Sequence, residues 1–308
     1  MRSARHLAIS VKCPICSSNE NVFSRKYRPR LPATFELFSG VSIRTCQNCL
    51  VSFADPMPPP DNLTSYYSEI YRCDGAWHRI NREPGPWDGP RVRARSQVEF
   101  LLAAAAKSCN PDQLKSWLDV GAGYGWLLDL AVKHGIQRTG AVEPDKYCRN
   151  RLIREKHEVY DHLSETGGRW DIISFSHVLE HLASPRPFLS QVYKQLSPNG
   201  YVFCEVPNVV DLDRETNDAP HLLFFTIPSI TALFENSGFT ILRIESCGPK
   251  SATNTPLELT RWLRRIAIHI FDSPPPLIDR MVHPHFSYSA AGTRAWIRLI
   301  AQKTVDLS

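Results

Sequence analysis

A glycine-rich turn followed by a carboxylate is the feature of this chain best suited to chemistry. The segment Leu118-Asp119-Val120-Gly121-Ala122-Gly123-Tyr124-Gly125 leads from an apolar run into the turn, and Glu143 lies eighteen residues after Gly125. Alternating glycines let the backbone approach a ligand closely, because no Cβ stands in the way. A carboxylate at the end of the next strand can accept hydrogen bonds from both hydroxyls of a ribose. The pattern therefore predicts a nucleotide-cofactor pocket.

The spacing of the glycines distinguishes two classes of nucleotide cofactor. The dinucleotide-binding fingerprint runs G-x-G-x-x-G, with a helix N-terminus aimed at a pyrophosphate. This chain has G-x-G-x-G from Gly121 to Gly125. That spacing favours S-adenosylmethionine over NAD, because S-adenosylmethionine has no pyrophosphate to bind.

Four cysteines near the start of the chain have the spacing of a metal site. Cys13 and Cys16 form one C-x-x-C pair, and Cys46 and Cys49 form a second after 29 intervening residues. Two such pairs place four thiolates around one Zn²⁺ and leave no open coordination position. We therefore expect a structural zinc site, with a redox pair or unliganded cysteines as the alternatives. The other five cysteines are scattered, and we expect them to pack as small apolar residues.

Strands and helices alternate through the rest of the chain. Strands are predicted at 116–120, 139–143, 158–160, 171–175, 201–206, 240–246 and 293–302. Helices are predicted at 96–107, 126–134, 146–155, 187–195 and 228–236. Alternation of this kind is typical of an α/β fold, in which a parallel sheet has helices on both faces.

Several of these elements carry motifs in the order found in one enzyme family. Besides the glycine loop they are the strand Trp170–Phe175, the segment Val178–Leu182, the turn Leu196–Gly200 and the strand Tyr201–Asn208. The chain from about 111 to 250 therefore resembles class I S-adenosylmethionine-dependent methyltransferases. The resemblance implies a Rossmann-like, seven-stranded sheet with an antiparallel last strand. Asn199 replaces a usual glycine in the turn, a mild change because Asn tolerates positive φ.

The resemblance also implies which residues bind the cofactor. Asp119 and Gly121 lie where the family contacts the amino-acid part of S-adenosylmethionine. Glu143 would bind the ribose, and Asp161 would bind the adenine amine. The predicted set is completed by Ala122, Gly123, Pro144 and Ser176. Two carboxylates have alternative roles, since Asp119 could cap the glycine turn and Asp161 could lie in solvent.

Three histidines are candidates for the general base that removes a proton from the methyl acceptor. His177 and His181 follow the strand that ends at Phe175, at the edge where open α/β sheets bind ligands. His221 lies after the next strand, in a segment that forms part of the acceptor wall in related enzymes. The pKa of histidine lies near neutrality, which suits proton transfer. The alternative is that these histidines only satisfy buried hydrogen bonds.

The chain divides into three predicted parts. Residues 1–55 form the zinc-ribbon-like cysteine module, and 56–110 form a segment rich in proline and aromatic residues, whose helix would cover the cofactor pocket. Residues 111–308 form the cofactor-binding domain, with an insertion at about 251–292. This order is similar to the N-terminal half of deoxysugar C-methyltransferases. The expected acceptor is a small molecule or glycan, such as a sugar, a natural product or a lipid-linked intermediate, methylated on oxygen, nitrogen or carbon.

Composition bears on location and partners. The longest apolar run is far shorter than the ~20 residues that span a bilayer, and no secretory signal is recognisable, so we expect a cytoplasmic enzyme. Residues 1–55 carry eight Lys/Arg against three Asp/Glu, which leaves a zinc-ribbon RNA methyltransferase as an alternative. Nucleic acid is the less favoured partner, because the core lacks an Asn-Pro-Pro-Tyr type motif for base flipping. A non-catalytic cofactor-binding scaffold is the other alternative.

A helix is also predicted at 257–271. Its apolar residues Leu259, Trp262 and Ile266 share one face, while Arg261 and Arg264 lie largely off that face. One interpretation is an ordinary helix packed on the core. The other is a basic amphipathic helix that rests on the inner face of an anionic membrane or holds a lipid-linked or phosphorylated acceptor.

Overall fold

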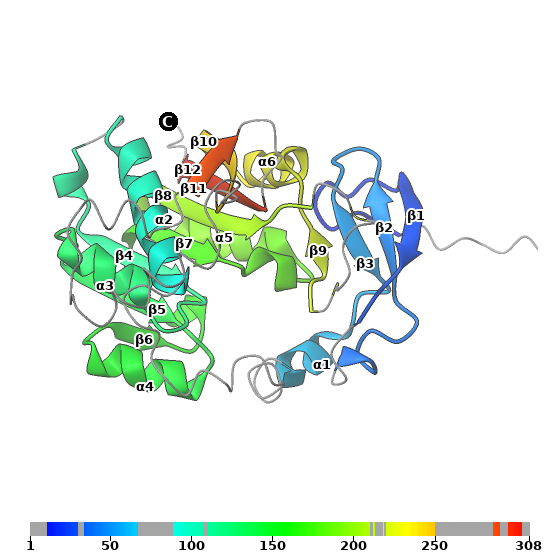
Figure 1. Cartoon of the computed structure of the whole chain (residues 1–308), viewed down its shortest axis with the longest axis horizontal. Helices are drawn as coiled ribbons and strands as arrows, with labels where there is room; N and C mark the ends of the chain where they lie inside the picture. Colours follow the sequence, from blue (N-terminus) through cyan, green and yellow to red (C-terminus); the bar gives the residue numbers. More distant parts are fainter. Residues whose placement is uncertain are drawn as a thin grey trace, which may run out of the picture.

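The computed structural model describes the chain at residues 11–29, 34–66, 89–107, 110–209, 212, 218, 220–249, 286–289 and 295–303. It contains a large sheet with helices on both faces and a small sheet built mainly from N-terminal residues (Figure 1). Among the described residues, no helix has both the length and the hydropathy needed to cross a bilayer. The predicted helix at 257–271 lies outside these ranges, as do Cys73 and Cys109, so its membrane role stays a prediction.

The large sheet has eight strands in the order β11-β10-β12-β8-β7-β4-β5-β6. They are β4 (Ser116–Val120), β5 (Arg138–Val142), β6 (Glu158–Tyr160), β7 (Trp170–Ser176), β8 (Leu196–Pro207), β10 (Phe239–Pro249), β11 (Phe286–Ser289) and β12 (Trp296–Lys303). Strands β4 to β8 are parallel, and β12 is antiparallel to both neighbours, β8 and β10. The predicted seven-stranded sheet with an antiparallel last strand is therefore confirmed. Strand β11 adds an eighth strand by pairing with β10.

Alternate residues of the central strands face two separate hydrophobic cores. Trp117 and Ile172 are buried with residues of α2 and α3, whereas Leu118 and Ile173 are buried with residues of α5 and α6. The helices are α2 (Gly89–Ala105), α3 (Trp126–Lys133), α4 (Lys146–Arg154), α5 (Pro185–Gln195) and α6 (Ile227–Glu235). Because successive side chains of a strand point to opposite faces, strands covered on both faces are apolar along their whole length.

The small sheet joins the N-terminal residues to a distant part of the chain. Its strands, in spatial order, are β1 (Asn21–Lys26), β2 (Ser42–Cys46), β3 (Ser52–Asp55) and β9 (Leu223–Phe224), and each pair of neighbours is antiparallel. Strand β9 belongs to the segment that follows β8, and Figure 1 shows it beside β3. The short helix α1 (Pro60–Ser65) follows the small sheet. The segment after β8 is therefore held by the N-terminal part of the chain.

Candidate active site

The glycine loop leaves β4 at the carboxyl edge of the large sheet and is held by Glu143. Gly121 and Gly123 have φ values of 72° and 56°, in the left-handed region that glycine adopts at little cost. The backbone N–H of Gly123 donates to Glu143 Oε2 at 2.6 Å, and the N–H of Asp145 donates to Glu143 Oε1 at 2.9 Å. Glu143 is buried. Its carboxylate therefore connects the loop to the end of β5.

Asp119 lies next to this loop, near the end of β4. Its side chain is buried, and its Oδ1 accepts a hydrogen bond from Ser174 Oγ at 2.6 Å. Burial raises the pKa of Asp119 to about 7; the hydrogen bond from Ser174 lowers it, and the nearby Glu143 carboxylate raises it. A cation placed beside such a carboxylate would favour its charged form.

The other predicted cofactor residues lie in two places. Ala122 directly precedes Gly123, and Pro144 directly follows Glu143, so both belong to the same loop region. Asp161 follows β6 and forms an ion pair with Arg149, which also donates to the backbone carbonyl of Glu143 at 3.4 Å. Asp161 is thus linked to the end of β5. Ser176 instead ends β7, among the polar groups around Glu205.

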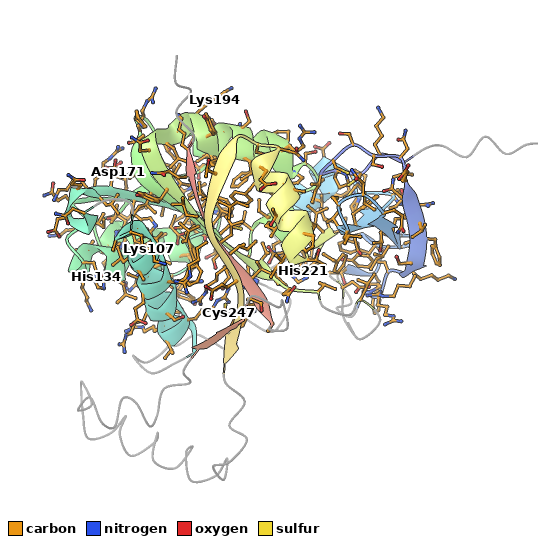
Figure 2. The ribbon with its side chains drawn as sticks, turned by 90° about the horizontal axis from the view of Figure 1, so that it is seen from above. Lys107, His134, Asp171, Lys194, His221 and Cys247 are labelled. Atoms are coloured by element: carbon orange, nitrogen blue, oxygen red, sulfur yellow. The ribbon has the colours of Figure 1, made fainter. Side chains whose placement is uncertain are left out.

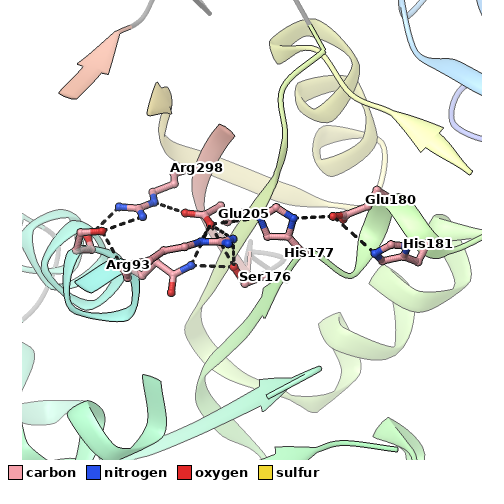
Figure 3. Close-up of polar contacts among 9 residues, drawn as sticks. Arg93, Ser176, His177, Glu180, His181, Glu205 and Arg298 are labelled. Carbon is pink, nitrogen blue, oxygen red and sulfur yellow. Dashed lines mark hydrogen bonds and ion pairs between the residues drawn. The ribbon is translucent and has the colours of Figure 1, made fainter. Parts of the chain in front are cut away.

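Two arginines hold the buried carboxylate of Glu205 on β8 (Figure 3). Arg93 Nε, from α2, donates to Oε1 at 2.5 Å, and Arg298 Nε, from β12, donates to Oε2. Ser176 Oγ lies beside Arg93 and accepts hydrogen bonds from Gln97 Nε2 at 2.8 Å and from Arg93 at 3.3 Å. Burial alone would raise the pKa of Glu205, but the guanidiniums of Arg93 and Arg298 hold it well below its usual range.

No sequence motif predicts this ion-paired group, although the two strands carry a signal for it. Glu205 is the single charge of β8, and Arg298 lies in β12 with two apolar residues on either side. They are also register partners in the antiparallel β8–β12 pair. A charged residue inside a core strand is rarely buried without a partner. Two residues of opposite charge in two such strands therefore indicate an ion pair. The residues become partners only once β12 is placed beside β8.

The three predicted histidines and Glu180 form one group, the His-Glu cluster (His177, Glu180, His181 and His221), after the end of β7. His177 has a φ of 57°, and its N–H donates to the backbone carbonyl of Glu205 at 2.8 Å. Its Nδ1 lies 2.9 Å from Glu180 Oε1, and its Nε2 lies 3.7 Å from Glu205 Oε1. Burial lowers the pKa of His177, but the two carboxylates outweigh this effect and raise it. His177 thus links the cluster to Glu205 (Figure 3).

His181 and His221 lie next to each other, and His181 contacts Glu180 as His177 does. Their ring centroids are 5.1 Å apart. His181 Nδ1 lies 3.5 Å from the carbonyl oxygen of Pro220, and His181 Nε2 lies 3.9 Å from Glu180 Oε1. Burial lowers the pKa of both histidines, that of His221 to about 4. Burial would raise the pKa of Glu180, but its contact with His177 and the charges of the histidines lower it.

The His-Glu cluster adjoins the glycine loop. Strand β7 lies next to β4 in the large sheet. A Cβ on Gly121 would come within 2.8 Å of Val178 Cγ2, in the segment that carries the cluster. The glycine loop therefore packs against the segment that carries the cluster.

The small sheet supports the segment that carries His221. Tyr27 Oη donates to the carbonyl oxygen of His221 at 2.5 Å. Arg25 donates to both carboxylate oxygens of Asp218, at 2.5 and 2.6 Å, and both side chains are buried. On the other side, the N–H of Leu222 donates to the carbonyl of Glu180 at 2.7 Å. Figure 2 shows His221 on the side of the large sheet that faces the small one.

The four predicted metal-binding cysteines converge at one end of the small sheet. The sulfur atoms of Cys13, Cys16, Cys46 and Cys49 all lie within 4.8 Å of one another. Cys13 Sγ is 3.5 Å from Cys49 Sγ, and Cys16 Sγ is 3.5 Å from Cys46 Sγ. Tetrahedral Zn–S bonds of about 2.3 Å place sulfur atoms about 3.8 Å apart. The arrangement therefore fits Zn²⁺.

Solved structures with a similar arrangement include two methyltransferases. Magnesium protoporphyrin IX methyltransferase from Synechocystis PCC 6803, with bound S-adenosylhomocysteine, is 13% identical with a TM-score of 0.47, over 78% of this chain and 97% of that one. A SAM dependent methyltransferase from Archaeoglobus fulgidus is 20% identical with a TM-score of 0.44, over 70% of this chain and 93% of that one.

Comparison of the sequence with known proteins identifies the family of this chain. Ubiquinone biosynthesis O-methyltransferases from Vibrio campbellii and Cronobacter sakazakii are 29% and 28% identical over 104 residues, which is 30% of this chain. The match spans less than half of those relatives, 44% and 43% of their lengths. Residues 91–244, half of the chain, match the family described as "Methyltransferase domain". The chain therefore belongs to this family, and its large sheet has the fold that the motifs of a class I S-adenosylmethionine-dependent methyltransferase predicted.

Proposed function

We propose that this enzyme transfers the methyl group of S-adenosylmethionine to a hydroxyl oxygen of a small-molecule acceptor bound at the His-Glu cluster. The observation that carries the proposal is the gathering of three histidines around the buried Glu180, directly beside the glycine loop. Methyl transfer needs the nucleophile and the methyl group side by side, and the sulfonium already activates the methyl group. The contact between Gly121 and the segment of Val178 supports that adjacency.

Oxygen is favoured as the methylated atom because the curated relatives are named O-methyltransferases. Their similarity covers 30% of this chain, so it supports the type of reaction more than the acceptor. For the acceptor we keep the classes that the sequence predicted, which are hydroxyl groups of sugars, natural products and lipid-linked intermediates. His177, His181 and His221 remain the residues proposed to assist removal of the hydroxyl proton.

We also propose that the four clustered cysteines hold one structural Zn²⁺. Four thiolates complete a tetrahedral shell and leave no position for a substrate. The proposed role is to close the turns that carry the ligands and so to stabilise the small sheet. Through Arg25 and Tyr27 that sheet holds the segment with His221.

An acceptor screen tests the proposed reaction. We expect release of S-adenosylhomocysteine with a hydroxyl compound, and a methyl ether detected by mass spectrometry. His221→Ala should lower turnover at least tenfold, with affinity for S-adenosylhomocysteine unchanged, because His221 contacts none of the proposed cofactor residues. Exposed His134, at the end of α3, is the matched control, and His134→Ala should keep full turnover. Methylation of carbon, nitrogen or RNA, or no turnover with any class, would contradict the proposal.

Affinity for the cofactor should depend on pH through Asp119. The free enzyme holds Asp119 with a pKa of about 7, and only the ionised carboxylate attracts the ammonium group of the cofactor. Affinity should therefore be lost as the pH falls through 7, by about tenfold between pH 8 and pH 6. Calorimetric titration with S-adenosylhomocysteine measures this change. Asp119→Asn should bind weakly at both pH values, and an unchanged slope in that variant would show that another group titrates.

A further inference from the structure

Three side chains of the His-Glu cluster converge as metal ligands do. One ligand atom each of Glu180, His181 and His221 lies within 4.8 Å of the other two. Metal–ligand bonds of about 2.0–2.2 Å place neighbouring ligand atoms about 3–4 Å apart, so small side-chain rotations would close the group. We infer that Glu180, His181 and His221 form a second metal site, for a divalent transition-metal cation, separate from the four cysteines.

Glu180 provides an observation that points to a cation independently of this convergence. Its side chain is 1% exposed. Oε1 lies 2.9 Å from His177 Nδ1 as an ion pair, but neither carboxylate oxygen accepts a hydrogen bond from any part of the chain that the structure describes. A buried carboxylate oxygen without a donor is costly, and buried charges are normally paired or coordinate metals. A cation bound to this carboxylate would remove that cost.

The two histidines are held in orientations that suit ligands. His181 Nδ1 lies 3.5 Å from the carbonyl oxygen of Pro220, and its Nε2 lies on the side of Glu180. A ligating histidine commonly donates its other ring nitrogen to a backbone carbonyl, which sets the ring orientation. His221 is fixed through its backbone, where its N–H donates to the carbonyl of Asp218 at 2.8 Å and its carbonyl accepts from Tyr27. The His181 ring is therefore oriented before an ion binds, and the backbone that carries His221 is held in place.

The donor set also defines the class of ion and what it can do. Two imidazoles and one carboxylate suit Zn²⁺, Co²⁺ and related ions, and three protein ligands leave an open coordination position. The use of that position rests on the proposed function. An acceptor hydroxyl bound to the ion would lose its proton to water, because a bound divalent cation lowers the pKa of the hydroxyl. The resulting alkoxide would take the methyl group from the sulfonium, which leaves as neutral S-adenosylhomocysteine.

Titration with Co²⁺ alone tests the site without S-adenosylmethionine or acceptor. The protein is first prepared with zinc in the cysteine site, and Co²⁺ binding is followed by visible absorption while released zinc is measured. We expect one Co²⁺ per chain with no zinc released. Glu180→Gln and His221→Ala should each weaken binding at least tenfold. His134→Ala is the control, since His134 is exposed and Figure 2 places it at the far end of the large sheet.

Two results would overturn the inference. Wild-type protein could take up Co²⁺ only in exchange for the zinc of the cysteines, or the Glu180 and His221 variants could bind it as tightly as wild type. Retained affinity for S-adenosylhomocysteine shows that each variant is folded, and His221→Ala decides the outcome if Glu180→Gln does not fold. Because the titration involves no methyl transfer, its failure would leave the proposed reaction standing, and an inactive enzyme could still bind the ion.

Discussion

Gly123→Val is expected to abolish binding of S-adenosylhomocysteine. A Cβ built on Gly123 meets no protein atom within 4 Å. The space beside this position is therefore open to a cofactor, and a branched side chain would occupy it. The φ of 56° adds strain, since a residue with a Cβ costs roughly 1–2 kcal/mol in the left-handed region. Calorimetry with S-adenosylhomocysteine measures the loss.

Gly135→Val separates these two effects. Gly135 follows α3, has a φ of 88°, and likewise has no atom within 4 Å of a built Cβ. Its substitution should lower stability by a similar amount while affinity for S-adenosylhomocysteine stays within about threefold of wild type, which is under 1 kcal/mol. Equal losses of affinity in the two variants would mean that backbone strain, and not the space for the cofactor, sets the result. Normal affinity in Gly123→Val would remove the glycine loop from the cofactor site.

Removal of zinc is expected to unfold the small sheet and leave cofactor binding intact. Structural zinc contributes roughly 10–16 kcal/mol in isolated fingers, which is more than the stability of a typical small domain. Protein prepared without chelators should carry one zinc per chain in the cysteine site, and a chelator should expose residues 11–55 to proteases. None of the proposed cofactor residues lies in that range, so affinity for S-adenosylhomocysteine should be unchanged.

Turnover should respond differently from cofactor affinity. Unfolding of the small sheet would release Asp218 from Arg25 and His221 from Tyr27, so methyl transfer should fall with zinc content. Cys46→Ser should reproduce the effect of the chelator, whereas Cys148→Ala removes a buried thiol outside the cluster and should retain the zinc. Absence of zinc at Cys13, Cys16, Cys46 and Cys49 in chelator-free protein would refute the assignment.

Local patterns in the sequence were sufficient for the cofactor-binding half of the fold. An apolar strand, a glycine turn and a carboxylate after the next strand carry their geometry within about 25 residues, from Leu118 to Glu143. Left-handed φ values at Gly121 and Gly123, and also at Asn199, follow from residue type alone. A seven-stranded sheet with an antiparallel last strand could be predicted as well, because the motifs occur in the order of a known family.

Contacts between distant residues could not be read in this way. Arg25 and Asp218 are separated by 193 positions, and neither belongs to a motif. The two-residue strand β9 is too short to have a period, and it exists because β3 offers a free edge. The start of α2 was misjudged for a related reason. A helix was predicted from Ser96, but α2 begins at Gly89, because Arg93 is half-buried against Glu205 although its charge suggests a solvent-exposed position.

The sequence by itself therefore determined the class of fold, and it predicted the cofactor and the cysteines and histidines that cluster. Those features depend on backbone conformation and on the spacing of ligands along short stretches of chain. Only the tertiary structure brought Glu180 between His177 and His181, placed His221 beside them and paired Glu205 with Arg298. The ionisation and ligand-binding capacity of these groups depend on burial and on partners from other strands, and both are decided when the chain folds.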